Sequence, residues 1–250
     1  MTERDNRQGA AALKRVDSRP LYAQVREVLL ERIGTSGWMP GDLIPNEFAI
    51  ARELGVSQGT MRKALDSLAA DRVLVRRQGR GTYVARHTPA DVLFRFFNFF
   101  DADGNRIEPD SCRASLAAGR ATSQERAKLA LGPRAKVIRI SRIRTWNGAP
   151  FIFETIILPE AFFPGLGKGR SVPNTVYDHF QKAYGVTIGR GEELLTAIAA
   201  GPAEAEALGI AEGAPLLKLD RVMHSLQNQR VEWRSSVCRL DGAAYRVELR

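Results

Sequence analysis

The chain has few residues of the kinds that make disulfides and metal sites. It contains two cysteines, Cys112 and Cys238, which is too few for a disulfide framework and indicates reduced thiols. Its three histidines show no metal-ligand spacing, so we expect no metal site and no cofactor. No apolar run reaches the roughly 20 residues of a membrane span. The polar start resembles no signal peptide, and we expect a cytoplasmic protein with no membrane partner.

Signatures of catalysis are absent as well. The sequence shows no Ser/His/Asp or Cys/His set, no glycine-rich phosphate loop and no metal cluster. We therefore predict no catalytic residues, and the chain is not expected to be an enzyme.

Positive charge, in contrast, is abundant and unevenly placed. The 37 Lys and Arg residues exceed the 28 Asp and Glu residues and give a net charge of +9. Between residues 52 and 86, eight basic side chains stand against three acidic ones, which is over half of the excess. A local basic patch of this kind is typical of a surface that binds a phosphate backbone.

The same stretch has the pattern of two short helices joined by a tight turn. Gly55 ends the first helix, and Ser57 is a suitable N-cap for the second. Apolar residues on the second helix follow the 3.6-residue period, at Met61, Ala64, Leu65 and Leu68. A plain helix pair with a solvated charged face would give the same pattern, so the following segment matters.

A basic hairpin follows the second helix. Val73–Val75 and Thr82–Val84 read as paired strands around a glycine-bearing turn. Helix, turn, helix and hairpin in this order predict a winged helix-turn-helix that places one helix in the major groove of double-stranded DNA. The predicted DNA-binding residues are Ser57, Gln58, Gly59, Thr60, Arg62 and Lys63 on the helix and Arg76, Arg77, Gln78, Gly79 and Arg80 on the hairpin.

This region resembles the DNA-binding domain of GntR-type bacterial transcription regulators over about residues 19 to 86. Three departures from the family pattern, Asn46, Phe48 and Gln58, put the operator sequence rather than the fold in doubt. The resemblance is carried by Leu21-Tyr22, Gln24-Val25, Pro40-Gly41-Asp42, Pro45, Glu47, Leu54-Gly55-Val56-Ser57, Thr60, Arg62, Ala64-Leu65 and Gly79-x-Gly81-Thr82.

The second half alternates strands with short helices, which predicts an α+β domain built on an antiparallel sheet. The alternation is clearest at residues 136–146, where Asn147-Gly148 is a strong hairpin signal before a partner strand at 151–158. Further strands are expected at 92–100, 192–199, 216–225 and 230–240, and helices at 123–131, 176–184 and 202–208.

The second half also resembles the UTRA effector-binding domain of the HutC subfamily, which is similar in fold to chorismate lyase. The resemblance implies a small-molecule sensor and a homodimer that reads a near-palindromic operator as a ligand-released repressor. It is carried by Arg142-x-Arg144, Asn147-Gly148-x-Pro150, Glu154, Leu158-Pro159, Thr175-Val176-Tyr177, Ala207-Leu208-Gly209, Gly213-x-Pro215-Leu216-Leu217 and Val231-Glu232.

Five residues are predicted to hold the effector. Arg142 and Arg144 lie two apart on one strand, so their side chains share a face and can clamp a small anion. Glu154 lies on the partner strand, and the resemblance adds Tyr177 and Glu232. The alternative is an ion-pair network across the hairpin that binds no ligand.

We expect a disordered tail at residues 1–17, a winged helix-turn-helix domain at 18–86, a linker at 87–92 and an effector-binding and dimerisation domain at 93–250. Two other functions stay open. The C-terminal half could be an enzyme with a chorismate-lyase-like fold acting on a small carboxylate, or the chain could bind nucleic acid without any sensor. The missing catalytic motifs argue against the first, and the ordered motifs of the second half argue against the other.

Overall fold

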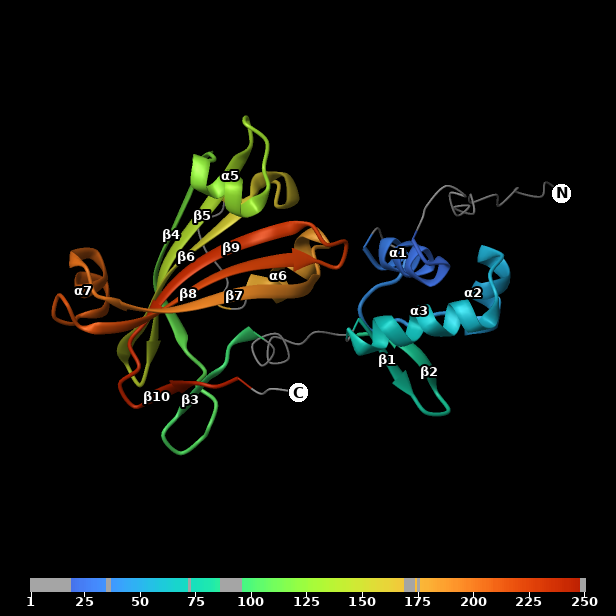
Figure 1. Cartoon of the computed structure of the whole chain (residues 1–250), viewed down its shortest axis with the longest axis horizontal. Coiled ribbons are helices and arrows are strands. Elements are labelled where there is room, and N and C mark those ends of the chain that lie inside the picture. The colour runs from blue at the N-terminus through green and yellow to red at the C-terminus, as the bar shows by residue number, and fades with distance from the viewer. Residues whose placement is uncertain are drawn as a thin grey trace. The chain divides into compact units, whose positions relative to one another are not determined.

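The computed structural model describes residues 19–34, 37–71, 73–85, 96–168, 174 and 176–247. The chain divides into two compact units, Met1–Arg86 and His87–Arg250 (Figure 1). The expected tail at 1–17 and the expected linker at 87–92 lie outside the described residues.

The first unit is a winged helix-turn-helix. Its helices are α1 (Leu21–Gly34), α2 (Glu47–Leu54) and α3 (Gln58–Ala70), and its wing pairs β1 (Leu74–Arg77) with β2 (Gly81–Val84) antiparallel. The predicted winged fold is confirmed, although the first wing strand begins at Leu74 rather than Val73.

Capping explains where α2 and α3 begin and end. The side chain of Asn46 accepts a hydrogen bond from the Ala49 backbone N–H at 2.8 Å and caps α2. Gly55 ends that helix in the left-handed conformation, with φ of 65°. Ser57 then caps α3 by accepting from the Thr60 N–H at 3.2 Å, so the polar start of α3 directly follows the turn.

The apolar face predicted for α3 forms the centre of this unit. Met61, Ala64, Leu65 and Leu68 are all buried, and α1 and α2 both pack against α3. The base of the wing is held by buried Leu74 and Val84. The polar face of α3 and the tip of the wing are therefore left on the surface.

The second unit is a six-stranded antiparallel sheet with flanking helices, as predicted. Its strand order is β4-β5-β6-β9-β8-β7, which leaves β4 and β7 at the edges. The strands are β4 (Asp110–Arg120), β5 (Lys136–Trp146), β6 (Ala149–Pro159), β7 (Ile188–Ala199), β8 (Pro215–Ser225) and β9 (Arg230–Cys238).

Shorter elements surround this sheet. The helices are α5 (Ser123–Leu129), α6 (Val176–Tyr184) and α7 (Pro202–Leu208), with 3₁₀ turns η1 (Glu160–Phe162) and η2 (Leu166–Lys168). A separate ribbon pairs β3 (Phe99–Asp101) with β10 (Ala243–Tyr245). Figure 1 shows α5 and α7 at different ends of the sheet. Helix α6 contributes Val176, Tyr177 and Phe180 to a core with Ile140, Ile156 and Leu158 of the sheet.

The strand predicted at 92–100 is confirmed only at its end, at Phe99 and Phe100, and residues 92–95 lie outside the described residues. Within the described part, Phe96 is helical and the strand comprises only Phe99–Asp101. Its apolar residues pack as a cluster instead, because the rings of Phe97 and Phe99 lie 4.9 Å apart and Phe99 contacts Phe151 edge to face. The sequence also gave no signal for β4, whose Ala and Ser residues are mostly exposed and show no apolar alternation.

Candidate DNA-binding surface and effector site

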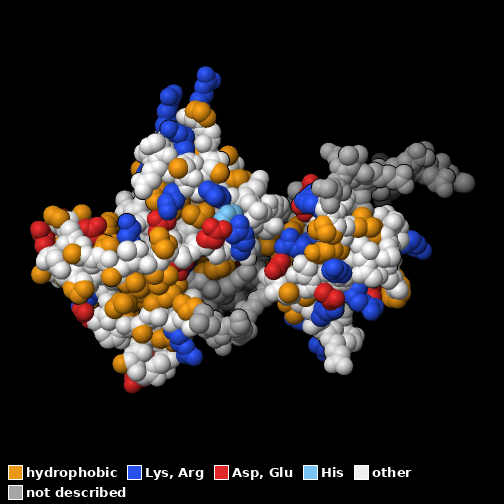
Figure 2. Space-filling view, viewed as in Figure 1, with side chains coloured by type: hydrophobic (Ala, Val, Ile, Leu, Met, Phe, Trp, Pro, Cys, Tyr) orange, Lys and Arg blue, Asp and Glu red, His pale blue; other side chains and the backbone are white. Residues whose placement is uncertain are grey.

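The outer face of α3 presents the residues predicted to contact DNA. Ser57, Gln58, Gly59, Arg62 and Lys63 are exposed, and Thr60 is half-buried. All of them except Ser57, the cap, lie in the first two turns of the helix, where its N-terminal end favours a phosphate. Figure 2 shows Lys and Arg side chains on the visible face of this unit.

Two of these side chains are held by neighbours in the free protein. Arg62 donates to Glu47 at 2.8 Å, and this hydrogen bond raises the pKa of the guanidinium. The Lys63 ammonium lies 4.3 Å from the centre of the Tyr22 ring. Glu47 and Tyr22 come from α2 and α1, so all three helices orient the recognition face.

The wing carries a second group of exposed basic residues. Arg76 pairs with Asp66 of α3 at 2.7 Å, which fastens the wing to the helix. The tip turns at Gly79 and Gly81, whose φ values of 69° and 104° favour glycine. Arg77, Gln78 and Arg80 are exposed on this turn, where a phosphate or the minor groove can be reached.

Four of the five predicted effector residues lie on one face of the large sheet, and the fifth, Tyr177, lies on helix α6. Arg142 of β5 is directly opposite Glu154 of β6, and Glu154 is opposite Ser236 of β9. Since side chains alternate along a strand, Arg144 and Arg234 share this face with them. The side chains of these residues, Arg142, Arg144, Glu154, Arg234 and Ser236, are all buried.

Glu154 is the acidic centre of the cluster. Its carboxylate accepts from Arg142 Nε at 2.5 Å, from Arg234 Nη1 at 3.2 Å and from Ser236 Oγ at 3.4 Å. Burial by itself raises the pKa of Glu154, but the charges of Arg142, Arg234 and Arg144 outweigh it and hold that pKa far below its usual range. Glu154 is therefore ionised in the folded protein.

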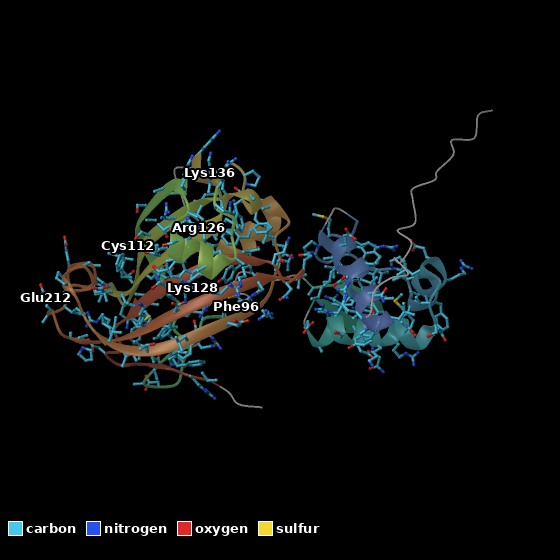
Figure 3. The ribbon with its side chains drawn as sticks, turned by 45° about the horizontal axis from the view of Figure 1, so that its top comes forward. Phe96, Cys112, Arg126, Lys128, Lys136 and Glu212 are labelled. Carbon is cyan, nitrogen blue, oxygen red and sulfur yellow. The ribbon has the colours of Figure 1, made fainter. Side chains whose placement is uncertain are left out.

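Glu232 and Tyr177 complete the network beside it. Glu232 accepts from Arg234 Nε at 2.9 Å and Nη2 at 3.2 Å, in the forked geometry that arginine favours. Tyr177 Oη donates to Glu232 at 2.8 Å, and burial raises the pKa of that phenol. The ring of Phe96, labelled in Figure 3, packs edge-on against Tyr177 with centroids 5.6 Å apart.

Arg144 differs from its neighbours because it has no carboxylate in hydrogen-bond contact among the described residues. It donates through Nη2 to the Pro109 carbonyl at 3.1 Å and to Asn174 Oδ1 at 3.2 Å. Its Nε is buried and has no hydrogen-bond partner within the described ranges. Burial, reinforced by the charges of Arg142 and Arg234, lowers the pKa of Arg144 to about 10. A buried donor without a partner costs about 1–3 kcal/mol of stability. An anion that accepted a hydrogen bond from the Arg144 Nε would remove this cost.

Arginines outnumber carboxylates on this face. The cluster contains four buried arginines: Arg142, Arg144, Arg221 and Arg234. It contains three carboxylates, of which Glu154 and Glu232 are fully buried and Glu193 is part-buried. One positive charge thus lacks a buried counterion in the described part of the cluster. An anionic ligand would supply both the charge and the acceptor.

The structure brings the five predicted residues into one network, but their role in binding an effector stays a prediction. The sequence reading missed Arg234, which lies two residues after Glu232 on the same strand and could have been found from that spacing. It also missed Ser236, which continues the same alternation on β9, and Asn174, for which no sequence signal existed. In the described ranges, no three His, Cys, Asp or Glu side chains gather as metal ligands, and no helix is long and apolar enough to cross a membrane.

The two units thus define a class: a winged helix-turn-helix domain joined to a domain with a buried polar cluster. Residues 21–84 match the model of the gntR family of bacterial regulatory proteins, and residues 107–243 match the UTRA domain. The chain belongs to the GntR family of transcription regulators, as a member of the HutC type with an effector-binding UTRA domain.

Individual relatives agree with this assignment. The chain is 33% identical over 204 residues to the histidine utilization repressor of Pseudomonas putida, a match covering 81% of each chain. It is 29% identical to the repressor NagR of Bacillus subtilis, covering 89% of this chain and 91% of that protein. The ligand-binding domain of a proposed GntR-family regulator from Bordetella bronchiseptica superposes with a TM-score of 0.55 at 27% identity, covering 62% of this chain and 98% of that one. These relatives are regulators, so the family supports regulation rather than catalysis.

Proposed function

We propose that this protein is a repressor that binds a near-palindromic operator as a homodimer and releases it when a small anionic metabolite binds beside Arg144. Because the target is chromosomal DNA, we place the protein in the cytoplasm. The observation that carries the proposal is the buried Nε of Arg144, which has no hydrogen-bond partner within the described ranges.

On the DNA side, each residue type suggests a role. Gln58 can pair with adenine, and Arg62 can reach guanine once it leaves Glu47. Ser57, Gly59, Thr60 and Lys63 allow or support close approach of α3 to the groove. The wing residues Arg76, Arg77, Gln78, Gly79 and Arg80 contact phosphates and set the register of the protein on the duplex.

On the sensor side, Arg142 and Arg234 are already neutralised by Glu154 and Glu232. Arg144 is left to take the negative group of the effector, with Asn174 and Ser111 as polar neighbours that hydrogen-bond each other at 2.7 Å. Glu154, Tyr177 and Glu232 offer acceptors and a hydroxyl to the rest of the ligand. This division favours a metabolite with one phosphate or carboxylate and several hydroxyls.

The effector can change operator affinity only by binding the two states of the dimer differently. Arg144 and Tyr177 are covered by Phe97 and Phe96, which the chain reaches shortly after the DNA-binding unit ends at Arg86. We propose that a ligand at Arg144 repacks these rings. We propose that this movement is what alters the placement of the DNA-binding domains.

The test replaces Arg144 with alanine in the full chain. An operator is first selected from random duplex DNA, and acidic metabolites are screened by thermal shift, where a ligand at a hundred times its Kd adds about 2.7 kcal/mol of stability. Arg144→Ala should bind the operator normally but need far more of the identified metabolite for release. Arg139→Ala removes the same charge from the other face of β5 and should respond like the wild type. Unchanged release by Arg144→Ala would refute the anion site.

A further inference from the structure

An exposed aromatic ring lies at the start of helix α2. Phe48 is 62% exposed, and it is the only aromatic residue among the large apolar side chains that are exposed in the described ranges. An exposed apolar residue by itself has little meaning, because single ones are common on protein surfaces. The position of Phe48 in the first unit is what distinguishes it.

The packing of α2 holds this ring at the surface. Ile50 and Ala51 are the buried residues of α2, and Phe48 falls on the flank of the face that they define. The side chain of Asn46 caps the helix two residues earlier by accepting from the Ala49 N–H at 2.8 Å. The backbone that carries the ring is therefore fixed, and the ring itself is presented to solvent.

A hydrogen bond places the first turn of α2 beside the predicted reading face of α3. Glu47, the residue before Phe48, accepts from Arg62 at 2.8 Å. Arg62 lies about one helical turn after Gln58, and both side chains are exposed. In a helix-turn-helix the second helix enters the major groove while the first crosses the DNA backbone. A side chain at this border between α2 and α3 can therefore reach the base edges at the rim of the groove.

The chemistry of the ring limits which base it can read. A phenylalanine side chain has no hydrogen-bond donor or acceptor, so it cannot pair with the polar groups of guanine, cytosine or adenine in the major groove. Thymine presents an apolar group there, its C5-methyl, and contact with an apolar side chain such as phenylalanine distinguishes it from the other bases.

We propose that Phe48 is a specificity-determining residue that contacts the C5-methyl group of one thymine in each operator half-site. This inference rests on the proposed function, because it requires a duplex operator. It assigns a base to a residue outside α3 and the wing, which hold the predicted DNA contacts. Because Glu47 joins the start of α2 to Arg62, the thymine should lie close to the position that Arg62 reads.

Replacing thymine with deoxyuridine removes this methyl group and nothing else, so it tests the contact directly. The probe is the duplex that the full wild-type chain selects from random-sequence DNA, with one thymine at a time replaced. At one thymine in each half-site, the replacement should weaken wild-type binding about fourfold, the value for burying one methyl-sized group. Phe48→Ala should bind the thymine and deoxyuridine duplexes equally.

Two further variants separate base reading from a general effect on the domain. Leu43→Ala is the matched control, because Leu43 is 57% exposed in the same unit but lies beside Tyr83 of the wing. It should leave the ratio of thymine to deoxyuridine binding unchanged. Phe48→Arg should shift the preference at the same position from thymine to guanine, since arginine pairs with the O6 and N7 of guanine. This gain of a new preference can be seen only in a folded protein.

The same measurements can overturn the inference. Wild-type binding that depends on no thymine methyl, or a Phe48→Ala variant that still discriminates, would remove Phe48 from the reading surface. A Phe48→Ala variant that binds all duplexes equally more weakly, with the methyl dependence intact, would place the ring on the sugar-phosphate backbone. A duplex selected without any methyl dependence refutes this inference alone, whereas the absence of any selected duplex refutes the proposed operator binding as well.

Discussion

The guanidinium carbon of Arg144 lies 5.2 Å from the centre of the Phe97 ring. In the free protein, therefore, the positive charge of Arg144 is stabilised in part by the electron-rich face of this ring. Such a contact contributes about 0.5–2 kcal/mol, and an effector that displaces the ring must overcome it.

Replacing Phe97 with leucine should tighten effector binding by about 2- to 30-fold, because it keeps an apolar side chain but removes the ring face that stabilises the free state. Isothermal titration with the metabolite found by the thermal-shift screen measures the change. Phe151→Leu, a change in the same aromatic cluster without the arginine contact, serves as control. Equal or weaker binding by Phe97→Leu would show that the ring is not a competitor of the ligand.

Arg62→Ala should weaken operator binding by about 1–3 kcal/mol and relax the base preference at one position of each half-site. The reason is that Arg62 is an exposed side chain early in α3, paired with Glu47 only until DNA competes for it. Arg52→Ala on α2 is the control for loss of one exposed charge. A binding isotherm with unchanged affinity at fixed salt would remove Arg62 from the reading surface.

Arg80→Ala at the wing tip should lower affinity to a similar extent for all DNA sequences. A phosphate contact adds about one unit to the slope of log affinity against log salt, so the slope should fall by about 1. Fluorescence anisotropy between low and moderate salt gives this slope. A change of base preference, with the slope preserved, would contradict a pure phosphate role.

Glu154→Gln should destabilise the second unit by about 3–5 kcal/mol at neutral pH, because the charge of Arg142 stays buried without its counterion, whereas Arg234 keeps Glu232. The exposed Glu212→Gln (Glu212 is labelled in Figure 3) should have little effect. Urea unfolding followed by circular dichroism measures both.

The dependence of the unfolding free energy on acid pH should reflect the ionisation of the Glu154 carboxylate. The folded-state pKa of Glu154 is lowered, so its contribution is complete above the unfolded glutamate pKa of about 4.3 and is lost as pH falls below it. The wild type should therefore lose more unfolding free energy than Glu154→Gln between about pH 5 and pH 3. Parallel pH profiles for the two proteins would show that Glu154 carries no such linkage.

Local patterns predicted much of this fold. Ser57 and Gly55 bound α3 as expected because capping depends on the conformation of a few adjacent residues. Asn147-Gly148 forms the predicted hairpin, with both residues at positive φ. Elements without such a local signal were not predicted correctly. Strand β4 was missed because its pattern of Ser and Ala carries no period. In the described part of the aromatic run at 92–100, a strand is found only from Phe99 onward, and the rings of Phe97 and Phe99 pack in one cluster.

The sequence by itself determined the winged helix-turn-helix and the α+β second half. These follow from periodicity, capping and motif spacing, which are properties of neighbouring residues. The alternation of one strand also predicted that Arg142 and Arg144 share a face, whereas Tyr177 and Glu232 were predicted only from the family resemblance. Only the tertiary structure decided which charges are paired. Arg142 has Glu154 while Arg144 retains a buried Nε without a partner in the described ranges, because strand register and burial, not sequence distance, set which side chains meet.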